Sequence, residues 1–202
     1  MKKVRLVGKL IDLDKSSILH EFKSFNADDW ITVGKPKWEV AGSSIIGGPE
    51  PDTHGQIFYK TPHSGDVVME FDARVIAPSD HDIVWWYQTS LESKPWGRGY
   101  LAALGGWYRN LAGIESVPDF ALSSTSNSYP IKSDQWYHIV SGAVANHHFI
   151  EADNSVVFEL VAPDPLPANH SGHFGFGIFQ SHVEYRNLVV YSPKWQRVDE
   201  KY

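Results

Sequence analysis

Short runs of Val, Ile, Phe, Tyr and Trp alternate along the chain with segments rich in Gly, Pro, Asn, Asp and Ser. This pattern is typical of many short strands joined by turns. Only residues 10–22, near the N-terminus, have a spacing that suggests one short helix. The predicted strands are 37–41, 44–47, 55–60, 66–76, 81–89, 98–104, 135–144, 147–153, 155–161, 172–180 and 183–191.

So many strands without intervening helices predict an all-β fold of two antiparallel sheets packed face to face, with a closed barrel as the alternative. No repeat or linker divides the sequence, so we expect one domain over residues 1–202, with a short irregular or helical N-terminal segment. The tract 105–133 is polar and poor in strand signal. Because long loops in compact domains are often lids or binding loops, we predict such a loop there.

Residues 66–75, DVVMEFDARV, show which side of a strand faces the core. The odd positions from Val67 to Val75 are all apolar, whereas Glu70, Asp72 and Arg74 fall on the other side with Val68. Side chains alternate between the two faces of a strand. The pattern therefore predicts one buried face and one solvated face.

The segment HDIVWWYQTS, residues 81–90, places two tryptophans side by side. Alternation predicts that Ile83, Trp85 and Tyr87 face the core. Trp86 then lies on the outer face with Asp82, Val84 and Gln88. An indole beside a carboxylate and an amide offers an apolar platform and hydrogen-bonding groups, which suits a sugar ring. The alternative is that Trp86 packs beneath a loop, for which the tract 105–133 is available.

Composition excludes several classes of function. The formal net charge is −6 and no Lys/Arg cluster is present, so we expect no nucleic-acid partner. The chain has no cysteine, which excludes disulfides, thiolate metal sites and cysteine catalysis. No stretch reaches the roughly 20 apolar residues of a membrane span. Lys9, Asp12 and Asp14 interrupt the basic N-terminus before a signal-peptide core forms, so we expect a cytoplasmic protein, or else a mature form that has lost its leader.

The order of motifs resembles the jelly-roll domains of the concanavalin A-like lectin/glucanase superfamily, especially bacterial 3-keto-disaccharide hydrolase-like and galectin-like domains. Residues 25–191 carry the resemblance, through the motifs at 28–48, 65–75, 134–160 and 172–193. It implies a twisted two-sheet sandwich whose concave face holds saccharide in many members. Glucanases of the superfamily carry Glu-x-Asp-x-Glu on one strand; here Glu70 and Asp72 are followed by Arg74.

Glu70 and Asp72 are candidate catalytic carboxylates, because residues two apart on a strand lie about 6–7 Å apart on one face. The alternative is a solvated face in which they pair with Arg74. His182 is a second acid/base candidate, and together with His170 and His173 it could bind a divalent metal, although no metal ligands are assigned. Scattered surface histidines are the alternative.

We therefore predict a carbohydrate-active protein that binds or processes an oligosaccharide or modified sugar on its concave face, as a monomer or homodimer. If it is an enzyme, the expected reaction is glycoside hydrolysis. Two alternatives stay open, a lectin-like module without catalysis and a structural or assembly jelly roll. Trp86 and Trp107 are expected to stack on the sugar. Gln88 and Arg109 are expected to hydrogen-bond to it, and Arg109 would suit an acidic sugar. The predicted substrate-binding residues are Trp86, Gln88, Tyr100, Trp107, Arg109 and His138.

Overall fold

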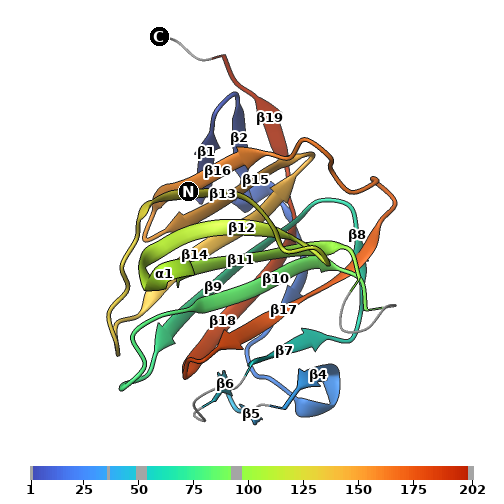
Figure 1. The fold of residues 1–202 in the computed structure, drawn as a ribbon. Helices are drawn as coiled ribbons and strands as arrows, with labels where there is room; N and C mark the ends of the chain where they lie inside the picture. Colours follow the sequence, from blue (N-terminus) through green and yellow to red (C-terminus); the bar gives the residue numbers. More distant parts are fainter. Residues whose placement is uncertain (1, 36, 49–53, 92–96, 200–202) are drawn as a thin grey trace.

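The computed structural model describes residues 2–35, 37–48, 54–91 and 97–199. Two large antiparallel sheets lie face to face, and a small third sheet stands at one end (Figure 1). The front sheet, named for its place in Figure 1, has the order β13 (Ala121–Ser128), β12 (Leu111–Val117), β11 (Gly99–Gly106), β10 (Ile83–Thr89), β17 (Ser171–Phe179), β7 (His54–Tyr59) and β4 (Trp30–Gly34), with β8 (His63–Ser64) also paired to β17.

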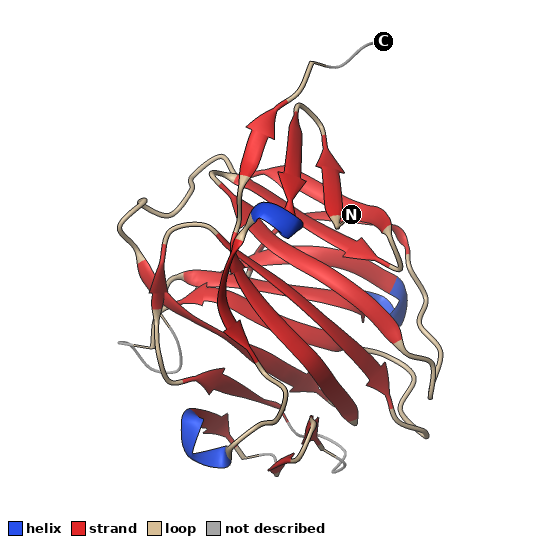
Figure 2. Cartoon of the chain, turned by 180° about the vertical axis from the view of Figure 1, so that it is seen from behind, coloured by secondary structure: helices blue, strands red, loops and turns tan. Residues whose placement is uncertain are grey.

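The back sheet faces the viewer in Figure 2. Its order is β16 (Ser155–Val161), β15 (His147–Ala152), β14 (Tyr137–Val144), β9 (Val67–Val75), β18 (Val183–Ser192), β6 (Ser44–Gly47) and β5 (Trp38–Ala41), with β3 (Ser17–Glu21) also paired to β18. The third sheet comprises β1 (Lys3–Leu6), β2 (Lys9–Asp12) and β19 (Trp195–Arg197). The helical segments are α1 (Trp107–Asn110) and the 3₁₀ turns η1 (Leu13–Lys15) and η2 (Ala27–Asp29).

Every predicted strand overlaps a strand of the structure, and the all-β two-sheet sandwich is confirmed. The helical segments in the described chain are single turns, and none has the length or apolar character to cross a membrane. The strands that the pattern did not predict are mostly short, or half-exposed along their length, as β3 is. Such strands have little apolar alternation to reveal them.

The core between the sheets follows the predicted alternation. The odd positions of β9 and the residues Ile83, Trp85 and Tyr87 of β10 belong to one buried cluster. The Trp85 ring meets Phe71 of the opposite sheet edge-on, with ring centroids 5.6 Å apart. The buried Tyr87 hydroxyl lies 2.9 Å from Nδ1 of His148, which satisfies its hydrogen-bonding group within the core.

The N-terminal segment differs from the predicted helix. Residues 10–22 form the end of β2, the turn η1 and strand β3. Strands β1 and β2 pack on the outer face of the back sheet, where Val4 and Ile11 join a second buried cluster with Val68. The expectation of a fully solvated outer face on β9 is therefore wrong, because this small sheet covers part of that face and leaves Val68 and Glu70 buried.

The tract 105–133 is largely not a loop. It continues the front sheet as β12 and β13, joined by a turn at 118–120. Strand β12 pairs with β11 through a register that shifts between Ala103 and Gly106, and α1 forms the connection between the two strands. Both strands contain few β-branched or aromatic residues, the types enriched in strands, which is why the pattern predicted a loop.

Candidate functional site: a pocket on the front sheet

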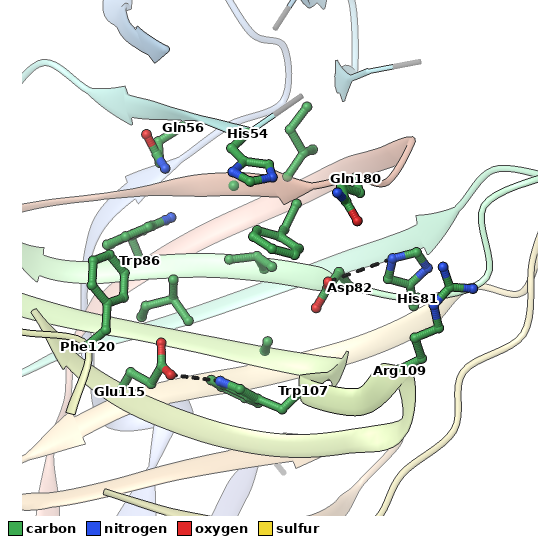
Figure 3. Close-up of a pocket in the computed structure, with 16 residues that line it drawn as sticks. His54, Gln56, His81, Asp82, Trp86, Trp107, Arg109, Glu115, Phe120 and Gln180 are labelled. Atoms are coloured by element: carbon green, nitrogen blue, oxygen red, sulfur yellow. Dashed lines mark hydrogen bonds and ion pairs between the residues drawn. The ribbon is translucent and has the colours of Figure 1, made fainter. Parts of the chain in front are cut away.

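A pocket of about 480 Å³ opens on the outer face of the front sheet (Figure 3). Its lining comes from the outward positions of β7, β10, β11, β12 and β17, closed at the sides by α1 and the turns next to these strands. The residues that line it are His54, Gln56, His81, Asp82, Val84, Trp86, Leu101, Ala103, Trp107, Arg109, Glu115, Phe120, Gly177, Ile178, Phe179 and Gln180.

Small residues at the centre of the sheet leave room for this pocket. Strand β17 presents Gly177 to the outer face, and a Cβ atom built there would lie 2.7 Å from Nε1 of Trp86. A larger residue would therefore collide with the Trp86 indole. Ala103 on β11 is similarly small and buried. The Gly-x-Gly alternation in GFGIF, residues 175–179, thus leaves the pocket floor free of large side chains.

Trp86 faces the pocket side of the sheet, as alternation predicted, but it is not an open platform. Its exposed fraction is 1%, because it belongs to an apolar cluster with Phe58 and Val84 on the outer face. The Phe58 ring contacts it edge-on at a centroid distance of 5.8 Å. The prediction that the Trp86 ring stacks in the open on a sugar is corrected: Trp86 supports the floor.

The aromatic rings that a ligand can reach lie at the rim of the pocket. Phe120, from the β12–β13 turn, is 42% exposed, and Phe179 at the end of β17 is 50% exposed. Phe179 stacks on His54 at a centroid distance of 4.2 Å. Trp107 is half-buried in the wall. Exposed rings around a pocket with an apolar floor supply the surface that the C–H face of a sugar requires.

Asp82 provides a buried carboxyl group at one end of the pocket. The residue is 8% exposed and has a φ of 64°, in the left-handed region. No described residue hydrogen-bonds to its carboxyl group, and Nε2 of His81 is 4.0 Å away from Oδ2. Burial raises the pKa of Asp82 to about 7, a shift that Arg109 opposes and Glu115 reinforces. A strained, desolvated carboxyl facing a pocket is typical of functional sites.

Glu115 of β12 provides a second carboxyl group in the pocket wall. Its Oε1 accepts a hydrogen bond of 2.7 Å from Nε1 of Trp107 (Figure 3). Burial raises the pKa of Glu115, and the hydrogen bond from Trp107 partly offsets that rise. Gln56, on β7, is 7% exposed, and its side-chain amide has no hydrogen-bond partner among the described residues. The pocket therefore contains buried polar groups that a ligand can satisfy.

Arg109 lies at the end of the pocket near His81 and Asp82 (Figure 3). Its side chain is 66% exposed, and Nη1 is 3.6 Å from Oδ1 of Asp80. Asp80 in turn accepts a hydrogen bond of 2.8 Å from Nδ1 of His81. Of the predicted binding residues, the structure brings Trp86, Trp107 and Arg109 together in this pocket.

Gln88 and Tyr100 do not line this pocket. Gln88 has a φ of 51°, and the register between β10 and β17 shifts between Trp86 and Thr89, so the strict alternation fails there. Its Nε2 donates a hydrogen bond to the Gly65 carbonyl oxygen. Tyr100 points into the core, where its ring lies 4.2 Å from that of His148. Their placement on the ligand face is corrected.

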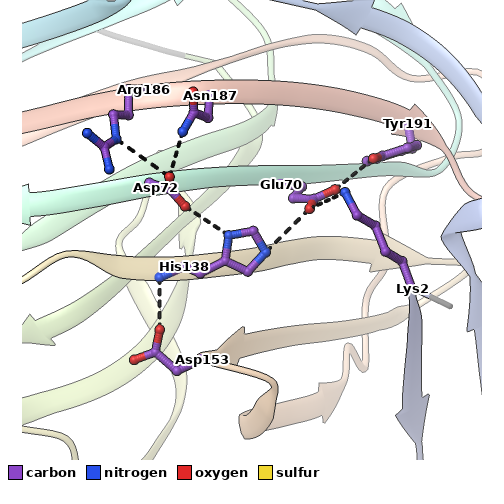
Figure 4. A network of polar contacts seen from close by, with 8 residues as sticks. All are labelled: Lys2, Glu70, Asp72, His138, Asp153, Arg186, Asn187 and Tyr191. Carbon is purple, nitrogen blue, oxygen red and sulfur yellow. Dashed lines mark hydrogen bonds and ion pairs between the residues drawn. The ribbon is translucent and has the colours of Figure 1, made fainter.

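Glu70, Asp72 and His138 do come together, but on the outer face of the back sheet (Figure 4). His138 Nδ1 lies 2.9 Å from Asp72 Oδ1, and His138 Nε2 lies 3.3 Å from Glu70 Oε1. These carboxylates raise the pKa of His138 to about 10. The predicted catalytic carboxylates and the Trp86 pocket therefore lie on opposite outer faces of the sandwich, which corrects the expectation of one shared face.

The remaining contacts of this network stabilise the packing of the N-terminal strands on the back sheet. Lys2 Nζ and the Tyr191 hydroxyl each donate a hydrogen bond of 2.7 Å to Glu70. Although burial opposes the effect, hydrogen bonds from His138, Lys2 and Tyr191 lower the pKa of Glu70 to about 2. A carboxylate whose oxygens are already occupied is poorly suited to exchange a proton with a substrate. Lys2 ties the N-terminal strands to β9.

The remaining histidine candidates are not gathered. His182 lies in the β17–β18 turn outside the pocket lining, and its backbone N–H donates to Ser79 Oγ. His170 and His173 each contact a different backbone carbonyl oxygen, those of Gln88 and Tyr59. Among residues 2–35, 37–48, 54–91 and 97–199, no group of three or more His, Asp or Glu side chains is arranged to hold a metal ion.

Several pocket residues were not identified from the sequence. Alternation predicts the outer face for Asp82, which lines the pocket on that face, but Asp82 is not among the predicted site residues. Glu115 and Phe120 fell within the tract that was read as a loop. His54 and Gln56 lie on a strand that was predicted, and the outward alternation of β7 was the available signal for Gln56. The alternating glycines of β17 were the other usable signal, because they mark a surface without side chains.

The sequence matches no protein-family model and no curated protein. Solved structures do match. The chain is similar to the carbohydrate-binding module CBM66 from Bacillus subtilis, with a TM-score of 0.64 and 20% identity over 81% of this chain and 96% of that one. It is similar to a Bacillus subtilis protein with a galectin-like fold, with a TM-score of 0.72 and 11% identity over 89% and 98% of the two chains.

A third similar structure is the exoplasmic/lumenal domain of VIP36 bound to Ca²⁺ and Man3GlcNAc, with a TM-score of 0.63 and 10% identity over 95% of this chain and 92% of that one. These similarities establish the architecture. The fold is a concanavalin A-like, galectin-like jelly roll, as the resemblance of the sequence motifs implied.

Proposed function

We propose that the protein binds a saccharide in the pocket on the outer face of its front sheet. The observation that carries this proposal is the pairing of an apolar, glycine-lowered floor with buried polar groups, Asp82 and Gln56, that have no hydrogen-bond partner among the described residues. Sugar rings need both an apolar surface and fixed polar groups. The exposed rings at the rim add contact area.

The similar structures support the same class of ligand. One is a carbohydrate-binding module, and another was solved with Man3GlcNAc. At 20% identity or less these similarities show the fold, and the ligand class is proposed from the pocket of this protein itself. The VIP36 structure also contains Ca²⁺. The described residues offer no comparable metal-binding group, and the proposed contacts do not depend on one.

Calorimetric titration of the protein against a panel of neutral, amino and acidic oligosaccharides tests the proposal. We expect Trp107→Ala to weaken binding, by about tenfold, because it removes a reachable ring and the support of Glu115. The matched control is Trp136→Ala, since Trp136 directly precedes β14 of the back sheet and its ring contacts the guanidinium groups of Arg74 and Arg186. Absence of binding across the panel, or equal loss in both variants, contradicts the proposal.

Hydrolysis of the bound sugar is a second candidate function, and the observation that favours it is the presence of two carboxyl groups with raised pKa values, Asp82 and Glu115, in one pocket. A protonated carboxyl can donate to the leaving oxygen while a carboxylate activates water or attacks the sugar. Release of reducing ends from a bound oligosaccharide, abolished by Asp82→Asn, supports this activity. Binding without any turnover supports a purely lectin-like module.

A further inference from the structure

We infer that the pocket selects saccharides that present a protonated amine to Asp82 and Glu115, and rejects those that carry a carboxylate. This inference rests on the proposed function and names the class of sugar that the same site prefers. The evidence is the negative charge of Asp82 and Glu115, which line the pocket, together with the side-chain hydrogen bonds that Asp82 and Gln56 lack among the described residues. It reverses the expectation that Arg109 would suit an acidic sugar.

The charged groups that reach the interior of the pocket are acidic. Asp82 is 8% exposed and Glu115 is half-buried, and both line the cavity. Neither is matched by a cationic side chain at ion-pair distance among the described residues, apart from His81 Nε2 at 4.0 Å from Asp82 Oδ2. The negative charge of Glu115 raises the pKa of Asp82, and the charge of both carboxylates repels anions in this partly desolvated space. A second anion in that space would be destabilised.

Arg109 does not reverse this balance. It is the cation of the pocket rim, its side chain is 66% exposed, and Asp80 lies 3.6 Å from it. Its charge is therefore screened by water and shared with a carboxylate outside the pocket. His54 and His81 complete the basic lining, and His81 is already engaged by Asp80. A carboxylate on the ligand would reach Arg109 only at the rim, while the buried acids would oppose deeper entry.

A second observation shows that the acidic groups belong to a binding site. Gln56, 7% exposed, lines the same pocket from β7, and its amide has no hydrogen-bond partner in the described chain. The polar atoms of this amide are not among the fully buried unpaired ones, so a ligand or water in the pocket can reach them and complete their hydrogen bonds. Gln56 can bind a sugar hydroxyl as donor or acceptor, and Asp82 can accept hydrogen bonds from an ammonium group. Together they fit an amino sugar with neighbouring hydroxyls.

The strength of Asp82 as an acceptor also depends on its ligand. Burial holds the pKa of Asp82 at about 7, so the empty pocket contains a mixture of acid and carboxylate near neutral pH. An ammonium group within hydrogen-bond distance favours the carboxylate form and makes a charge-assisted hydrogen bond. A neutral hydroxyl gains less from the same position. An amino sugar therefore gains more from Asp82 than its neutral analogue does.

The test uses oligosaccharides of the same length and linkage built from a hexose, from its 2-amino-2-deoxy analogue and from its uronic acid, titrated calorimetrically at about pH 7. We expect the amino form to bind about tenfold more tightly than the neutral form, and the uronate to bind at least about tenfold more weakly. Asp82→Asn should remove most of the amine advantage, so that the amino and neutral forms bind this variant within about threefold of each other. Asp72→Asn, the same change on the opposite face, should preserve the preference.

The outcomes separate the two proposals. If the neutral sugar binds but the amine gives no advantage, or if the uronate binds as tightly, the charge selectivity is wrong and saccharide binding stands. If Asp82→Asn keeps the amine advantage, Asp82 is not the group that discriminates between the amino sugar and its neutral analogue. If no member of any matched set binds, saccharide binding itself is contradicted. To check that Asp82→Asn folds, its denaturation midpoint is compared with that of the wild-type protein.

Discussion

Trp107 holds Glu115 in the pocket wall through a hydrogen bond of 2.7 Å from indole Nε1 to Oε1. Trp107→Phe keeps an aromatic ring but removes this donor. Because the bond lowers a pKa that burial raises, we expect the pKa of Glu115 to increase in the variant. Carbon-detected NMR titration of the Glu115 carboxyl measures the change. Trp136→Phe on the back sheet is the control, and an unchanged Glu115 titration in Trp107→Phe contradicts the assigned bond.

Asp82 makes folding stability depend on pH in a direction that can be measured. Its pKa is about 7 in the folded protein and near 3.8 in a solvated chain. Between these values the folded state binds a proton that the unfolded state has lost, so this group makes the free energy of unfolding decrease as pH rises from about 4 to about 7. We expect Asp82→Asn to stabilise the protein at pH 8, by roughly 1–4 kcal/mol, and by much less at pH 4.

Urea denaturation of both proteins across that range checks the prediction. The difference in the free energy of unfolding between Asp82→Asn and wild type should grow with pH and then level off above the folded pKa. A difference that is constant with pH, or that grows toward acid, would show that Asp82 is solvated or paired rather than desolvated.

The Glu70–His138 pair predicts a bell-shaped contribution to stability. The pKa of Glu70 is lowered to about 2, so its contribution is present above 4.5 and is lost as pH falls toward 2. The pKa of His138 is raised to about 10, so its contribution is present below 6.5 and is lost as pH rises toward 10. We expect His138→Gln to destabilise the protein most between about pH 4.5 and 6.5. Denaturation midpoints at pH 3, 5.5 and 9 test this, and a destabilisation that is equal at all three would contradict it.

Loss of the buried contact between Tyr87 and His148 should lower the free energy of unfolding, independently of the pocket. Burial lowers the pKa of His148 to about 4, so the ring is neutral at physiological pH and faces the Tyr87 hydroxyl at 2.9 Å. Tyr87→Phe leaves the ring nitrogen without this partner and should cost about 1–3 kcal/mol of unfolding free energy. The double variant Tyr87→Phe/His148→Leu should recover part of that loss. No recovery would show that shape, rather than the hydrogen bond, determines the cost.

Alternation along single strands made much of the fold predictable. It placed Trp85 in the core and Trp86 on the opposite face of the same strand, and it identified the buried side of β9. It failed where the backbone leaves the regular extended form. Gln88, with a φ of 51°, lies at a register shift, so alternation extended from Trp86 predicts the wrong position for its side chain.

The site was less predictable because its residues are brought together by sheet order. Glu70 and Trp86 both lie on outward positions, yet β9 and β10 belong to different sheets, and strand periodicity carries no information on which sheet a strand joins. The exposure of Trp86 likewise depends on Phe58, a neighbour from β7. Glu115 was missed because a half-polar strand resembles a loop when it is read alone.

Whether the front-sheet pocket is the saccharide site can be tested by NMR mapping of the backbone amides during titration with an oligosaccharide that binds. We expect shifts concentrated in β10, β17 and α1, with Asp82, Trp107 and Gln180 among the largest, and little change around Glu70 and His138. Shifts centred on Glu70, Asp72 and His138 of the back sheet, with the front-sheet pocket unaffected, would contradict it.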